Sequence, residues 1–209
     1  KNAAPLCPEP ILIVGHEAQM VIDHAGPQCG YVHQTEQNGT GHAVMVARNM
    51  LLEQAPRNVH VLYGDQPLIS TNTLQSLVDE REMHNAPIAV ATVQAPDFDG
   101  YHEAYVSYGR MIRDEHDNIV RIVEKKDANE EELAVMEFNT GIYCFETEWL
   151  LEHLLHLSTD NAQGEYYLTD LVGFAAEQGK PVRGVAVENT YEGLGANTPE
   201  QVKALEQFI

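Results

Sequence analysis

Strand-like and helix-like segments alternate along the chain, and this alternation limits the folds that it can adopt. The strand-like runs are ILIVG (11–15), VHVLYG (59–64), IAVATV (88–93), GIYCFE (141–146) and VRGVAV (182–187). Helical spacing of apolar residues covers 17–24, 42–54, 71–84, 147–157, 165–178 and 198–208. Such alternation is typical of a mostly parallel sheet with helices on both faces. We predict an α/β fold.

One segment departs from this rhythm. AYVSYGRMIRDEHDNIVRIVEKKDA reads as two strands about a polar turn at 114–118, which is typical of a β-hairpin and not of a crossover unit. We predict a single domain over 1–209 with an inserted hairpin lobe, about 100–140, over a ligand cleft. Gly179 ahead of Pro181 marks one helix end, and Thr198 with Pro199 marks the start of the last helix.

Charge and composition exclude several classes of function. The formal net charge is −20, which disfavours nucleic-acid and anionic-membrane partners. Three widely spaced cysteines argue against a disulfide framework or a zinc site. The ten histidines show neither HxxxH nor HExxH spacing. No apolar run approaches the roughly 20 residues of a membrane span, and the first ten residues lack the apolar region of a signal peptide. We expect a cytoplasmic protein.

The stretch QNGTGHAVMVARNMLL places turn residues where a helix begins. Apolar residues at helical spacing predict a helix from about His42, with Thr40 as its N-cap. Gly39 and Gly41 remove side chains there, so that a nucleotide can approach the backbone amides. The alternative is an ordinary tight turn with a cap.

The stretch NVHVLYGDQPLIS runs from an apolar strand directly into Gly64 and Asp65. Open α/β sheets bind ligands at the carboxyl ends of their strands. A single carboxylate there suits Mg²⁺, which protein sites hold with one or two carboxylates and substrate phosphates. The alternative is that Asp65 caps the turn before Pro67.

Near the hairpin, Gly109 and Asn139 suit contacts to a sugar or a base, and Glu124 suits hydrogen bonds from sugar hydroxyls. Their structural alternatives are a bulge at Gly109, an ion pair of Glu124 with a neighbouring lysine, and a turn at Asn139. The stretch NAQGEYYLTD, at the start of the 165–178 helix, adds a dense polar and aromatic set typical of carbohydrate binding. The alternative is that Tyr166 and Tyr167 only pack and that Asp160 or Gly164 only caps the helix.

Six blocks follow one another in a specific order: QTEQNGTGHAV, VLYGDQPLIS, YGRMIRD, IVEKKDA, FNTGIYCF and NAQGEYYLTDL. In this succession they resemble the uridyltransferase domain of bacterial N-acetylglucosamine-1-phosphate uridyltransferase, over about residues 10–200. The resemblance implies a Rossmann-like nucleotide-diphospho-sugar transferase fold. It also implies Mg²⁺-dependent synthesis of UDP-N-acetylglucosamine from UTP and N-acetylglucosamine 1-phosphate, with release of pyrophosphate.

Carried over where the motifs match, the resemblance implies a role for eleven residues. Asp65 and Asn197 would hold the Mg²⁺ and serve catalysis. The other nine would bind the nucleotide (Gln34, Gly39, Thr40, Tyr63 and Gly64) or the acetylated sugar (Gly109, Glu124, Asn139 and Tyr167).

The sequence also departs from the family's pattern. The Gly-rich loop Leu-Ala-Ala-Gly-x-Gly-Thr-Arg-Met and a following Pro-Lys pair have no match, and residues 1–10 are a Pro-rich substitute. The stretch DFDGYHEAYVSYGR is longer than the family's usual segment leading to Gly-Tyr-Gly-Arg. Around Asn197, GAN replaces the usual GVN. The hexapeptide repeats of the acetyltransferase β-helix are absent, so we expect neither acetyl transfer nor a trimer formed through that domain. A nucleotide-sugar binder without turnover, or a nucleotidyltransferase of other specificity, is the alternative function.

Overall fold

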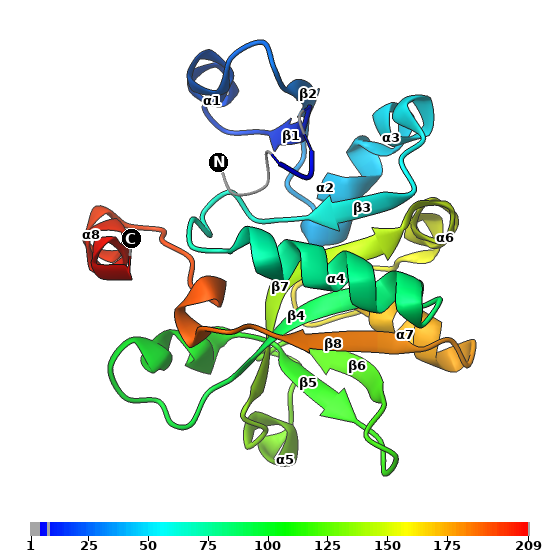
Figure 1. Ribbon diagram of the computed structural model, residues 1–209, viewed down its shortest axis with the longest axis vertical. Helices are drawn as coiled ribbons and strands as arrows, with labels where there is room; N and C mark the ends of the chain where they lie inside the picture. The colour runs from blue at the N-terminus through cyan, green and yellow to red at the C-terminus, as the bar shows by residue number, and fades with distance from the viewer. Residues whose placement is uncertain (1–4, 8, 209) are drawn as a thin grey trace.

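The computed structural model describes residues 5–7 and 9–208, so parts of the Pro-rich start lie outside it. The main sheet has six strands (Figure 1). Its order is β6-β5-β7-β4-β8, and β3 lies off this path and pairs with β7. The strands are β3 (Asn58–Val61), β4 (Ile88–Gln94), β5 (Arg110–Arg113), β6 (Ile119–Val123), β7 (Glu137–Glu146) and β8 (Val182–Ala186).

Most strands of this sheet run in the same direction, as predicted, but the sheet contains both parallel and antiparallel pairs. β4 and β8 pair in parallel. β7 is antiparallel to β3, β4 and β5, and β5 is antiparallel to β6. Therefore β3, β4, β5 and β8 run in one direction, and β6 and β7 run in the other. Because the reversed β7 lies inside the sheet, most of its ladders are antiparallel.

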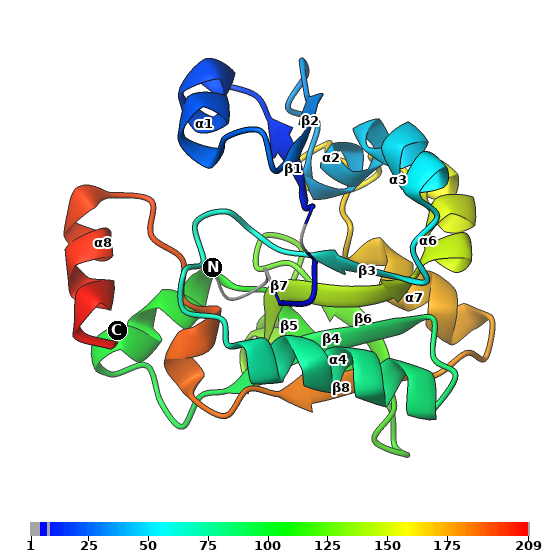
Figure 2. The same cartoon turned by 45° about the horizontal axis from the view of Figure 1, so that its top comes forward.

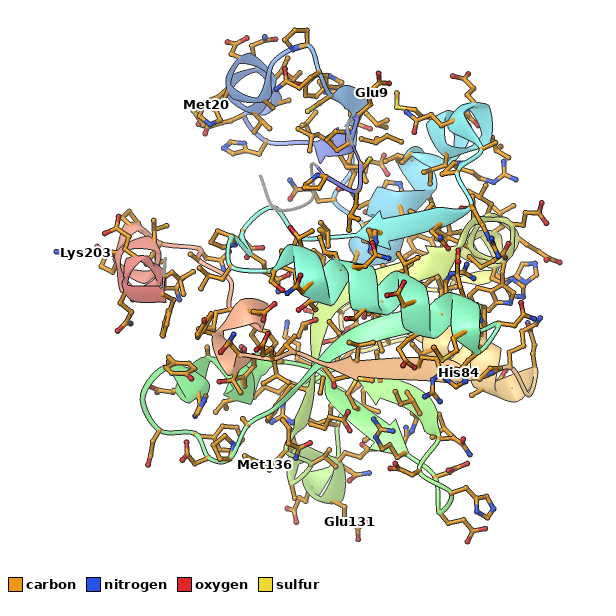
Figure 3. The ribbon with its side chains drawn as sticks, in the orientation of Figure 1. Glu9, Met20, His84, Glu131, Met136 and Lys203 are labelled. Carbon is orange, nitrogen blue, oxygen red and sulfur yellow. The ribbon has the colours of Figure 1, made fainter. Side chains whose placement is uncertain are left out.

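The first two strands stand apart from this sheet. β1 (Ile11–Val14) and β2 (Gly30–His33) pair with each other in parallel and form no ladder with the six-stranded sheet. They carry α1 (Ala18–Ala25) above β3 (Figures 1 and 2). Ile11, Ile13 and Val32 pack against the main core, whereas α1 buries none of its residues. Met20 on α1 points into solvent (Figure 3).

Helices cover both faces of the sheet, and β4 shows why its sequence is apolar throughout. Ile88 and Val90 join the core cluster that includes helices α6 and α7, and Ala89 and Ala91 join the cluster of α4. Successive strand residues point to opposite faces, so a strand covered twice needs apolar residues at every position. The helices are α2 (Thr40–Val46), α3 (Arg48–Gln54), α4 (Thr71–Met83), α5 (Glu130–Leu133), α6 (Thr147–His153), α7 (Asp170–Glu177) and α8 (Pro199–Leu205). Short 3₁₀ turns are η1 (Gly100–Ser107), η2 (Leu154–His156), η3 (Thr190–Gly193) and η4 (Glu206–Phe208).

Two predicted helices were wrong in extent. The predicted helix at 42–54 is two helices, α2 and α3, which meet at the buried Ala47. The predicted helix at 165–178 begins only at Asp170. Residues 165–169 stay non-helical because the Tyr166 amide donates to Asn38 O (2.9 Å) and Tyr166 O accepts from the Gly41 amide (2.8 Å).

The predicted hairpin and helix-end signals are confirmed. β5 and β6 pair in antiparallel, and β5 joins β7, so the hairpin continues the main sheet. Gly179 after α7 has φ +67°, and Lys180 N donates to Ala175 O, which is the glycine-terminated helix end of a Schellman type. Thr198 caps α8 through its hydroxyl, which accepts from Gln201 N. No helix in the described part of the chain combines the length and apolarity that a membrane crossing requires.

Candidate active site

One hollow of about 250 Å³ gathers residues from five separate stretches of the chain. They come from the segment after β3, the two ends of the β5–β6 hairpin, the middle of β7 and the turn before α8. Six of the eleven residues predicted for the site line this hollow: Tyr63, Asp65, Gly109, Glu124, Asn139 and Asn197. Gln66, Ser107, Tyr108, Thr140 and Gly141 complete the wall, and the sequence did not single them out.

A bulge in β7 shapes the floor of the hollow. Val90 pairs with Tyr143 and Thr92 pairs with Asn139, so two extra residues of β7 lie opposite this part of β4. Gly141 lies in the bulge with φ +79°, and the Tyr63 ring lies directly against its Cα. Bulges bend a strand and redirect its side chains. The glycine inside an apolar strand-like run was the available signal for this feature.

Asn139 is held so that its amide nitrogen is available to a ligand. Its Oδ1 accepts from the Gly141 amide and from the Tyr143 hydroxyl, both at 3.0 Å. Its Nδ2 has no hydrogen-bond partner within the described chain, although Asn139 is buried and lines the hollow. Asn139 therefore lies inside β7 with a fixed orientation, and the predicted turn alternative does not apply.

Glu124 closes the hairpin side of the hollow. Its Oε1 accepts from Thr169 Oγ1 at 3.4 Å. Burial raises the pKa of this carboxyl most, and the charges of Asp127 and Asp170 raise it further. Lys126 donates instead to Gln163, so the alternative of a lysine ion pair for Glu124 is not what the described structure contains.

Glu124→Gln is expected to stabilise the fold near neutral pH. The folded pKa of Glu124 lies above its ordinary 4.5, so the carboxylate costs stability above the folded pKa, and this cost disappears as the pH falls below 4.5. The neutral amide avoids the cost. We expect the free energy of unfolding to rise by more than about 0.5 kcal/mol, the usual limit for surface changes, near pH 7.5, and the difference from wild type to vanish near pH 4.

Urea unfolding of both proteins across this pH range measures the effect. Glu131→Gln is the matched control, because Glu131 is exposed on α5 and points away from the body (Figure 3). A pH-independent difference for Glu124→Gln, or an equal change in the control, would contradict the pKa assignment.

The NGTG segment is packed against protein more than it is open to a ligand. A Cβ on Gly39 would lie 2.7 Å from Tyr166 O, and Gly39 has φ +100°. The helix begins at Thr40 with Gly39 at the N-cap, so the predicted start at His42 and the Thr40 cap are wrong. The Thr40 hydroxyl accepts instead from Leu168 N at 3.1 Å. These glycines therefore allow close packing on the 165–168 segment.

This segment still reaches the hollow through Tyr63. Burial raises the pKa of the Tyr63 hydroxyl to about 12, the charges of Glu124 and Asp65 raise it, and a hydrogen bond with Thr40 lowers it. Thr40 and Asp65 thus both lie close to one tyrosine. The predicted entrance of α2 and the predicted strand-end carboxylate belong to the same region of the molecule.

The remaining predicted residues lie outside the lining of the hollow. Gln34 Nε2 contacts His42 Nδ1 (3.1 Å) and Gly39 O (3.4 Å). Gly64 lies between Tyr63 and Asp65. Tyr167 is buried, and its hydroxyl donates to Asp127 Oδ2 at 3.3 Å.

Asp65 and Asn197 line the hollow, Asp65 partly exposed and Asn197 exposed. Neither side chain forms a hydrogen bond or ion pair within the described chain, so Asp65 does not cap the turn before Pro67. A Cβ on Gly195 would lie 2.7 Å from Asp65 Oδ2, and Ala196 N donates to Asp65 O at 2.9 Å. One carboxylate and one amide oxygen that lack protein partners form a donor set that suits a hard cation with substrate oxygens. Among the described residues, no group of three His, Cys, Asp or Glu side chains could hold a metal.

A second hollow, of about 210 Å³, lies where β3, β4 and β8 begin, and it has a structural explanation. Its cations are Arg57, Arg81 and Lys180. Arg57 and Lys180 follow the C-termini of α3 and α7, and Arg81 lies in the last turn of α4. The helix dipole favours positive charge at these ends. The guanidinium of Arg81 also donates to Ala86 O at 3.2 Å. None of the predicted site residues lies there.

The sequence pattern that defines the family "Nucleotidyl transferase" matches residues 13–193. The chain belongs to the nucleotidyl transferase family. Among its relatives, the bifunctional protein GlmU of Enterococcus faecalis is 42% identical over 189 residues, which are 90% of this chain and 40% of that protein. The bifunctional protein GlmU of Streptococcus agalactiae is 41% identical over 199 residues, covering 95% of this chain and 42% of that protein. The chain therefore spans about two fifths of the curated relatives that it matches.

The fold of this nucleotidyl transferase is also that of a solved structure, the CMP:2-keto-3-deoxy-manno-octonic acid synthetase complexed with CTP. The TM-score is 0.66 at 16% sequence identity, over 96% of this chain and 80% of the other. At that identity the likeness concerns the fold alone. It confirms the α/β nucleotide-sugar transferase class predicted from the sequence.

Proposed function

We propose that this nucleotidyl transferase transfers a uridylyl group from UTP to N-acetylglucosamine 1-phosphate. The observation that carries the proposal is that Asp65, Asn197, Gly109, Glu124 and Asn139 line the same hollow. Asp65, Gly109, Glu124 and Asn139 come from the ordered blocks that resemble a uridyltransferase domain, and Asn197 comes from the GAN stretch that follows them. In the reaction, a phosphate oxygen of the sugar phosphate attacks the α-phosphorus of UTP, the bond to the β-phosphate breaks, and pyrophosphate leaves.

The chain's own residues would divide into two groups around the reacting phosphates. The free Nδ2 of Asn139 and the Glu124 carboxylate suit the acetamido and hydroxyl groups of the sugar, beside the side-chain-free Gly109. Tyr63 would form the wall between sugar and nucleotide, and Thr40, Gly39, Gln34 and Gly64 would extend the nucleotide side. Tyr167 would act on the sugar side, where its hydroxyl holds Asp127. Catalysis would consist mostly of positioning and charge neutralisation.

Asp65 and Asn197 would hold one Mg²⁺, whose contribution is to neutralise phosphate charge. The fit rests on their unpartnered oxygens and on the direct approach of the Gly195 backbone to Asp65. We further propose that residues 1–209 act as one domain, in which the hairpin at about 100–140 supplies the sugar-binding wall. Substrates would be small molecules in the cytoplasm, with no nucleic-acid or membrane partner and no trimer formed through a β-helix.

The test uses the full-length product of the gene, UTP, Mg²⁺ and N-acetylglucosamine 1-phosphate, with pyrophosphate release as the readout. Parallel reactions with ATP, CTP, GTP and dTTP and with glucose 1-phosphate establish specificity. Release with UTP and the acetylated sugar only is the expected result. Faster release with another pair would favour a related nucleotidyltransferase of different specificity.

The absence of a match to the family's Gly-rich loop within these 209 residues favours one alternative, a binder of nucleotide sugars without turnover. Calorimetry with UDP-N-acetylglucosamine separates the two. Binding without pyrophosphate release under any condition would support the binder and overturn the transferase.

A further inference from the structure

Two segments that are far apart in the sequence are fastened together beside the hollow. The segment 65–70 follows β3, and the segment 192–197 runs from η3 to α8. Three hydrogen bonds join them: Ala196 N to Asp65 O (2.9 Å), Gln66 Nε2 to Gly193 O (3.1 Å) and Ser70 N to Glu192 Oε2 (3.0 Å). Asp65 and Asn197 lie at one end of these paired segments, and Ser70 and Glu192 lie at the other end.

Glu192 is a buried carboxylate without a cationic partner in the described chain. Glu192 is only 2% exposed. Oε2 accepts from Ser70 N and from Thr73 Oγ1 (2.7 Å). Ser70 is the N-cap of the 13-residue α4, so the carboxylate lies at the positive end of a helix dipole, where charge-assisted hydrogen bonds are strong.

A buried charge contributes little net free energy to folding, because its desolvation offsets most of what its hydrogen bonds contribute. The same carboxylate gives a fixed geometry, since it ties the first turn of α4 to η3. Beyond η3 the chain is held at two further points. A Cβ on Gly195 would lie 2.7 Å from Asp65 Oδ2, so the chain passes close to this carboxylate, and Gln201 Oε1 accepts from Asn197 N at 2.7 Å. Displacement of residue 192 would therefore be transmitted to Asn197.

We propose that Glu192 is a positioning residue that sets the distance between Asp65 and Asn197 and thereby the affinity for the divalent cation. This inference rests on the proposed function, because it takes those two residues as the cation ligands. Glu192 does not line the hollow itself. It acts through Ser70 and the 192–197 segment.

The test compares Glu192→Gln with Glu188→Gln in the full-length protein. Glu188 is exposed four residues away and makes no hydrogen bond or ion pair in the described chain, so it controls for the change in charge. Two quantities are measured: hydrogen exchange of the Ala196 and Gly195 amides, and Mn²⁺ affinity in the presence of UTP from the EPR spectrum of the ion.

For Glu192→Gln we expect about tenfold weaker Mn²⁺ binding, the lower end of what outer-shell partners contribute to metal affinity, and faster exchange of the two amides. Glu188→Gln is expected to match wild type in both. Thr73→Val removes the bond from Thr73 Oγ1 to the carboxylate and its bond with Ser70 Oγ, and it substitutes no residue of the 192–197 segment. It should shift both readouts in the same direction by less, and it serves as the test if Glu192→Gln does not fold.

Wild-type Mn²⁺ affinity and amide exchange in Glu192→Gln, together with a lowered unfolding midpoint, would reduce Glu192 to a structural role and overturn the inference. Absence of Mn²⁺ binding by the wild type would overturn it as well. If the wild type binds Mn²⁺ but releases no pyrophosphate with any nucleotide, the proposed function fails while the Mn²⁺ comparison still decides the role of Glu192.

Discussion

Asp65→Asn is expected to lower kcat for pyrophosphate release by about 10²–10⁴-fold, because the amide would weaken binding of the proposed cation, and a bound metal ion contributes several kcal/mol of charge stabilisation. The amide has nearly the same shape, so the hollow is kept. The Asp65 side chain forms no hydrogen bond within the described part of the chain, and therefore the free energy of unfolding should change by less than about 0.5 kcal/mol. Steady-state kinetics over a Mg²⁺ titration and urea unfolding measure the two effects.

Asp160→Asn is the matched control, since Asp160 is exposed and its carboxylate has no bonding partner in the described chain. It should keep wild-type kinetics. A wild-type kcat and Mg²⁺ dependence in Asp65→Asn would refute the assignment of Asp65 to the cation. A large loss of stability in the same variant would point to a structural carboxylate.

The parts of the fold that depend on local pattern were predictable. IAVATV is apolar at every position because β4 is covered on both faces, and it forms a strand close to its predicted limits. Asp65 follows an apolar strand, a position that predicted either a carboxylate facing a ligand or a turn cap, and it lines the hollow. Thr198 and Gly179 act on neighbouring backbone groups only, so a short stretch of sequence was enough to find both helix ends.

The parts that depend on distant partners were not predictable. Residues 165–169 have apolar spacing compatible with a helix, but the backbone amide and carbonyl of Tyr166 bond to Asn38 and Gly41, which are more than a hundred residues away in the sequence. Gly39 suggested a ligand, and the group that approaches it is Tyr166 O. Gln66 and Glu192 carried no motif, because their importance lies in joining two segments that only the fold brings together.

Gly141→Ala is expected to destabilise the protein by about 2–5 kcal/mol. Gly141 has φ +79°, and an alanine in a left-handed conformation costs about 1–2 kcal/mol. The added Cβ would also lie 2.9 Å from Tyr63 Cδ2, and closer still to Cε2, and overpacking of this kind costs about 1–3 kcal/mol. Urea unfolding measures the sum.

One further variant is a control for a glycine-to-alanine change, and another separates the backbone strain from the overpacking. Gly173→Ala in α7 places a Cβ where no atom lies within 4 Å, and it should stabilise the protein by about 0.5–1 kcal/mol because alanine favours a helix. Tyr63→Ser removes the ring, so Gly141→Ala made in that background should lose only the backbone part, about 1–2 kcal/mol. Equal losses with and without the ring would mean that Tyr63 does not pack on Gly141, and the wall proposed between the sugar and the nucleotide would then be wrong.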